Sequence, residues 1–232
     1  MDYAKKKIVM WSVCLASGLA ASANADILYD ATDFNTSGGV YANNYYPDHP
    51  TSGSYLAVDD IAVGAGGWTI DTVSVWGGQL LGDSDTTTEA YLTVYSKSLG
   101  FVNPLDHATV VTVTQTPEDF TDPGGIPSTR TLQRFDVSGL GLTLSEGEYW
   151  IGLTPILAGS NPFGAWSSHT DQGDSPMQYK VETNEWFTLG GDFTNWGPDM
   201  MMRIQGSPAP APGAAMMAPV AMLVLGRRRR RG

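Results

Sequence analysis

The chain has 232 residues, a single cysteine and a formal net charge of −11. Lysines near the start and arginines at the end conceal a more acidic centre, because residues 26–206 hold 23 acidic and five basic side chains, a balance near −18. Binding to nucleic acid through its phosphates needs the opposite sign of charge, so that class of function is excluded. The cysteine, Cys14, precedes this centre, which therefore offers no thiol nucleophile and no thiolate metal site.

The start of the chain has the three parts of a secretory signal peptide. Residues 5–7 are all lysine, and residues 8–21 are mainly apolar. Ala23 and Ala25 then form an A-x-A cleavage site, which makes Asp26 the first residue of the mature chain. We therefore expect a signal helix over residues 1–25 that is removed on export.

Residues 26–206 form one predicted domain without a long helical period. Several runs alternate polar and apolar residues with period two, as half-buried β-strands do. The predicted strands are Ile27–Ala31, Tyr55–Val63, Trp68–Trp76, Ala90–Tyr95, Thr109–Thr114, Thr129–Val137, Glu148–Leu153, Gly164–Ser168, Met177–Val181 and Met200–Gln205.

Glycine- and proline-rich segments separate these runs, and we place Gly77 and Gly78 in one of the turns. The clearest alternation is in Trp68–Trp76, where Trp68, Ile70 and Trp76 would share one face. The pattern predicts an all-β fold, a single jelly-roll-like β-sandwich flanked by the N-terminal signal helix and a short apolar C-terminal helix.

Four segments resemble exported β-sandwich domains that open with the pattern ADDF…W.I..V..WG and often carry sorting anchors. The matching residues are Ala57–Val63, Gly66–Gly77, Leu92–Ser96 and Gly147–Leu153. The resemblance implies the fold and an extracellular location, and it implies no activity.

Clustered carboxylates suggest a cation site, because Ca²⁺ prefers carboxylate and carbonyl oxygens. Asp83, Asp85 and Glu89 follow a glycine in a predicted loop and are the candidate ligands, with Ca²⁺ as the suggested cofactor. Solvated loops would carry the same residues without a metal. Asp59 and Asp60 are adjacent in a predicted strand, so we expect one to point inward, where it needs backbone N–H groups, an arginine or a metal as partner.

Aromatic residues suggest a second kind of site, because sugar rings stack on exposed aromatic rings. Trp186 and Trp196 lie in predicted loops and are the candidate ligand-binding residues. Trp68, Trp76 and Trp150 lie in predicted strands, where we expect them to fill the core.

No catalytic set is apparent in the sequence. The three histidines occur in predicted loops, and no G-x-S-x-G motif places a serine nucleophile. A glycosidase would need two carboxylates across a cleft, and the many Asp and Glu residues single out no pair. We therefore predict a protein that is not an enzyme.

Residues 207–232 combine a Pro/Ala linker, an apolar run and a basic end. The twelve residues 214–225 carry no charge, but a membrane-spanning helix needs roughly 17–20 apolar residues, so we expect a short transmembrane segment that is a marginal, temporary anchor. The positive-inside rule would keep the arginines in the cytoplasm and the domain outside it. The expected sorting residues are Pro208, Pro210, Pro212, Arg227, Arg228, Arg229, Arg230 and Arg231.

This tail resembles the PEP-CTERM sorting domain of exported bacterial proteins, through Pro208-Ala209-Pro210 or Pro210-Ala211-Pro212 before the apolar run. The glutamate of that family's motif is absent from both triplets. The resemblance implies export machinery and an exosortase-like membrane enzyme as partners, a transient inner-membrane stage, and a final place at the cell surface or outside the cell. We expect a structural or adhesive protein of the cell surface or extracellular matrix. The alternative is a carbohydrate-binding module for extracellular polysaccharide, with or without Ca²⁺.

Overall fold

The structure is a computed structural model that describes residues 25–33, 40–48, 53–79, 86–118, 132–158, 162–172, 176–188 and 198–209. Its strands form two sheets, and all paired strands run antiparallel. The predicted all-β class is therefore confirmed for this part of the chain. The expected signal helix and C-terminal apolar helix lie outside the described residues. Within those residues, no helix is long and apolar enough to cross a membrane.

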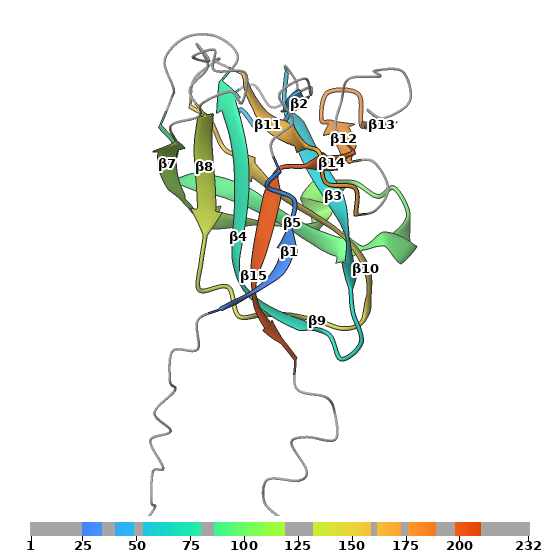
Figure 1. Cartoon of the computed structure of the whole chain (residues 1–232). Helices are drawn as coiled ribbons and strands as arrows, with labels where there is room; N and C mark the ends of the chain where they lie inside the picture. The colour runs from blue at the N-terminus through green and yellow to red at the C-terminus, as the bar shows by residue number, and fades with distance from the viewer. Residues whose placement is uncertain are drawn as a thin grey trace, which may run out of the picture.

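Nine strands form the first sheet, in which β4 is central. This strand pairs with β15 along one side, with β8 and β9 along the other, and with β11 at its end. Figure 1 shows β4, β8 and β15 running side by side. The strands of this sheet are β1 (Asp26–Asp30), β2 (Val40–Ala42), β4 (Trp68–Gln79), β7 (Thr114–Glu118), β8 (Leu132–Val137), β9 (Leu142–Leu144), β11 (Phe163–Ser168), β14 (Asp199–Met200) and β15 (Met202–Pro208).

Six strands form the second sheet, in the order β13-β12-β3-β10-β5-β6. Two short 3₁₀ helices, η1 (Lys97–Leu99) and η2 (Pro104–His107), connect β5 to β6. The strands are β3 (Tyr55–Val63), β5 (Glu89–Ser96), β6 (Ala108–Thr112), β10 (Gly147–Pro155), β12 (Met177–Lys180) and β13 (Glu185–Thr188).

The main hydrophobic core contains side chains from both sheets, such as Val73 and Phe135 from the first and Ile61 and Leu153 from the second. Two smaller apolar clusters lie apart from it, on the outer faces, which are the faces turned away from the main core. One contains Val58, Tyr95, Trp150 and Met177, and the other contains Trp76, Leu132, Trp166 and Met201.

The predicted alternation along Trp68–Trp76 is wrong in its second half. Ile70 belongs to the main core, but so does Val73, whereas Trp76 belongs to an outer-face cluster. The pairing of β4 with β15 shifts by one residue between Gln205 and Gly206, opposite the segment from Thr72 to Ile70. Such a β-bulge reverses which residues face the core, because side chains alternate with period two.

Trp76 and Trp150 are therefore buried, as expected, but on outer faces instead of in the core between the sheets. Trp68 is half-buried and packs against the main core.

The turn predicted at Gly77 and Gly78 is also wrong, because both glycines lie inside β4. They pair with Ala165 and Gly164 of β11. A Cβ atom on Gly77 would lie 2.2 Å from the ring of Phe163, so this position is glycine because the two strands approach closely there.

The other predicted strands are found within a few residues of their expected bounds. β3 matches its expected range, and β10 extends beyond it in both directions. The short strands β2, β7, β9 and β13 were missed or merged with neighbours. β15 continues to Pro208, and Ala209 N donates to the carbonyl oxygen of Gly67 at 2.9 Å, so regular structure extends past the expected domain end at Gly206.

Candidate functional site

A groove lies on the outer face of the first sheet, across β8, β4 and β15. It encloses about 300 Å³. Its residues alternate along the three strands with core residues such as Val73, Val75, Phe135 and Ile204. We call it the arginine groove, and it is lined by Thr72, Ser74, Trp76, Arg134, Asp136, Arg203 and Gln205.

Trp76 lies between the two arginines of the groove. Its ring centre is 5.8 Å from Cζ of Arg134 and 5.7 Å from Cζ of Arg203. These distances allow a favourable interaction between each cation and the π face of the ring. With 6% of its surface exposed, Trp76 forms the floor of the groove and offers no broad ring surface for stacking.

Carboxylates fix the position of Arg134. Its Nε donates to Asp136 Oδ2 at 2.8 Å, and its Nη1 donates to Glu118 Oε1 at 2.5 Å. Ser74 Oγ donates to the other oxygen of Asp136 at 2.6 Å. The hydrogen bond to Asp136, more than any other effect, raises the pKa of Arg134. This guanidinium group is therefore charged and held in one orientation.

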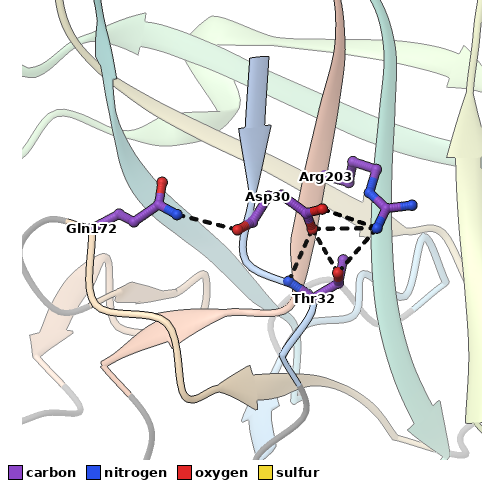
Figure 2. Close-up of polar contacts among 4 residues, drawn as sticks. All are labelled: Asp30, Thr32, Gln172 and Arg203. Carbon is purple, nitrogen blue, oxygen red and sulfur yellow. Dashed lines mark hydrogen bonds and ion pairs between the residues drawn. The ribbon is translucent and has the colours of Figure 1, made fainter. Parts of the chain in front are cut away.

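Arg203 is held by the neighbouring strand β1 (Figure 2). Its Nη2 lies 3.0 Å from Asp30 Oδ2 and 3.1 Å from Thr32 Oγ1, and Gln172 Nε2 donates to the carbonyl oxygen of Asp30. Burial alone would raise the pKa of Asp30, but the hydrogen bonds from Thr32 and Arg203 outweigh it and lower that pKa. In Figure 2 one terminal guanidinium nitrogen of Arg203 makes the dashed contacts with Asp30 and Thr32, and the other terminal nitrogen lies on the far side, away from Asp30.

A second polar cluster lies in the interior, where β3 meets β14. Asp59 is fully buried and accepts hydrogen bonds from Met200 N at 2.8 Å and from Asp60 N at 3.1 Å. Asp199 Oδ2 accepts from Gln172 N at 2.9 Å, and the hydroxyl of Tyr29 lies 3.4 Å away from it. The bond from Met200 to Asp59 joins the two sheets.

The pKa values of both acids in this cluster are raised. Burial, and then the nearby charge of Asp199, raises the pKa of Asp59 well above its usual range. Burial likewise raises the pKa of Asp199 to about 6. Of the partners proposed for an inward aspartate, the structure gives Asp59 backbone N–H groups, whereas Asp60 faces outward and pairs with Lys97 at 3.0 Å.

Among the predicted ligand-binding residues, Trp186 lies in β13 and not in a loop. It is half-buried, and its Nε1 donates to the carbonyl oxygen of Val102 at 2.9 Å. Its ring is tilted by 57° to that of Tyr179 and by 44° to that of Phe101. These three rings therefore form no flat platform for a sugar. Trp196 lies outside the described residues.

Of the predicted Ca²⁺ ligands, Glu89 is exposed at the start of β5 and pairs along the backbone with Thr112. Asp83 and Asp85 lie outside the described residues. In the described part of the chain, no three His, Cys, Asp or Glu side chains are grouped to hold a metal ion.

The expected processing residues fall almost entirely outside the described ranges, as Ala23, Pro210, Pro212 and Arg227–Arg231 do. Ala25 is exposed just before β1, and Pro208 ends β15 opposite Trp68.

Sequence reasoning missed the arginine groove. Arg134 and Arg203 are far apart in the sequence, and each resembles an ordinary solvated charge there. The one signal in the sequence was that basic residues are scarce in residues 26–206. There are five of them, and two line the groove.

A comparison of the sequence with known protein families and with characterised proteins found no match to either.

Proposed function

We propose that this chain is an exported β-sandwich protein of the cell surface or extracellular matrix, with a structural or adhesive role and no enzymatic activity. A signal peptide would direct it out of the cytoplasm, with cleavage after Ala25. The C-terminal tail would hold it briefly in the membrane, where an exosortase-like enzyme would process it.

One observation carries this proposal: both ends of the folded domain leave it on the same side. β1 starts beside the end of β15, with Asp26 paired to Gly206. Figure 1 shows the start of β1 and the end of β15 at the lower end of the domain, and the end of β4 at the upper end. A domain attached through residues beyond Ala209 would therefore point its opposite end away from the membrane.

The arginine groove favours a second candidate function, that of a carbohydrate-binding module. It offers fixed polar side chains on an open sheet face, and it lies along the side of the domain and not at the end that would be attached. Attachment would thus leave the groove accessible. The two candidates are compatible, because an adhesive surface protein needs a ligand.

Cell fractionation tests the export and anchoring proposal. N-terminal sequencing of the exported protein should begin Asp26-Ile27-Leu28, and a variant with Arg227–Arg231 replaced by glutamine should be retained less well in the membrane, because cytoplasmic positive charge opposes translocation. A matched variant in which Arg227–Arg231 are replaced by lysine keeps the positive charge and should behave as the native chain does. The proposal fails if the mature chain keeps residues 5–7, or if the glutamine variant fractionates as the native chain does.

A further inference from the structure

We propose that the arginine groove binds a neutral polysaccharide, with its two arginines acting as fixed hydrogen-bond donors to sugar hydroxyl groups. This proposal depends on the carbohydrate-binding candidate above, and it does not depend on the route of export.

The charge around the groove selects a neutral ligand. Two guanidinium groups line it, but the three carboxylates of Asp30, Glu118 and Asp136 hold them within hydrogen-bond distance. The net charge of these five side chains is thus negative, and the sequence of the domain is itself strongly acidic. A polymer that carries carboxylate or sulfate groups would be repelled, whereas hydroxyl groups would not.

The hydrogen-bonding groups of the groove also match hydroxyl groups, which both donate and accept. Thr72 provides a hydroxyl oxygen that can accept a hydrogen bond, since its own proton is donated to Asp71 Oδ2 at 3.1 Å, and Gln205 provides a side-chain amide that can both donate and accept. The carboxylates hold both arginines in place before any ligand arrives. Binding would therefore require little further ordering of these long side chains.

The position of the groove disfavours an extended peptide. Peptides that bind sheets commonly add a strand to a free edge, where main-chain groups are unpaired. β8, β4 and β15 each have a paired strand on both sides, so the groove offers side chains in place of a free edge. Its volume of about 300 Å³ is at the lower limit for ligand sites, and its open face lets a longer sugar chain continue beyond it.

Affinity electrophoresis of the full chain, purified in detergent, tests this proposal. Native gels would contain a neutral polysaccharide (dextran, xylan or a β-glucan) or an acidic one (alginate or polygalacturonate). At least one neutral polymer should slow the native chain. The double variant Thr72→Ala/Gln205→Ala should bind that polymer about tenfold or more weakly, because it loses hydrogen bonds to the ligand.

The matched control is Thr109→Ala/Thr112→Ala, which alters two exposed threonines on β6 of the other sheet. It should bind as the native chain does, and circular dichroism should show that both double variants are folded. Retardation by acidic polymers alone, no retardation by any neutral polymer, or equal binding by the two double variants would each overturn the proposal. Because purified protein is used, failure here would leave the export proposal standing.

Discussion

Asp59 and Asp199 show what single side chains do in this fold. Both are buried where the sheets meet, and Asp59 accepts a hydrogen bond from the backbone of Met200 across that contact. A buried carboxylate is costly unless it is paired or protonated, which explains the raised pKa values of the two acids. Asp60 and Asp171 add further negative charge near Asp199.

The first prediction concerns pH. The pKa of Asp199 is raised from 3.8 to about 6, so the folded protein binds this proton more tightly than the unfolded chain. The resulting stability is fully present below about pH 3.8 and is lost as the pH rises through about 6. The melting temperature of Asp199→Asn should therefore fall less than that of the native chain between about pH 4 and about pH 7.

Asp26→Asn is the matched control, because it removes the same charge at an exposed position. Its melting curve should keep the pH dependence of the native chain. Parallel curves for Asp199→Asn and the native chain would contradict the assignment.

The second prediction compares two tryptophans. Trp76 is 6% exposed and contacts both groove arginines, so Trp76→Ala should lower the free energy of unfolding by about 3 kcal/mol. Trp186 is half-buried, so Trp186→Ala should cost clearly less. Urea denaturation of both variants measures the difference. Equal losses of unfolding free energy in the two variants would contradict the difference in burial between Trp76 and Trp186.

At the scale of elements, β3 and β10 show how closely two strands can approach. Gly152 of β10 lies against β3, and a Cβ atom there would be 2.2 Å from the carbonyl oxygen of Ala57. Asp59 and Ile151 are the last residues of β3 and β10 that pair directly. Past them the side chain of Asn43 joins the two strands, since it accepts a hydrogen bond from Ala57 N and donates one to Leu153 O. A shift that separated the two strands would break these hydrogen bonds.

The third prediction follows from this contact. Gly152→Ala should lower the free energy of unfolding by about 1–3 kcal/mol or more, because the backbone must shift to admit the methyl group. Gly64→Ala is the control, since a Cβ atom there meets no other atom within 4 Å. Thermal denaturation of both variants measures the effect. If Gly152→Ala is no less stable than Gly64→Ala, the close approach is not as the structure has it.

Individual strands could be predicted from the sequence where alternation is uninterrupted, as in Tyr55–Val63. Which side chains of β4 point into the core could not be predicted, because the bulge in β4 depends on its pairing with β15, which comes much later in the chain. The arginine groove was unpredictable for the same reason, since strand pairing alone brings Arg134 and Arg203 to opposite sides of Trp76. Gly77 resembled a turn residue because sequence does not reveal the ring of Phe163 beside it.

At the scale of the whole molecule, the domain has two distinct ends. The two ends of the folded chain leave at one end of the domain, and the groove lies along its side. The proposed anchor would fix this orientation, with the domain outside the cytoplasm and the arginine run inside. The proposed export and anchoring therefore require one membrane topology, in which the domain and the arginine run lie on opposite sides of the membrane.

Cysteine labelling tests that claim most directly, because the sequence has no cysteine after Cys14. Thr183→Cys places a thiol on an exposed turn of the domain, and Gly232→Cys places one beyond the arginine run. A membrane-impermeant maleimide, added to cells with an intact cytoplasmic membrane, should label Thr183→Cys and spare Gly232→Cys until the membrane is permeabilised. Protection of both thiols, or labelling of both before permeabilisation, would contradict the proposed export and anchoring.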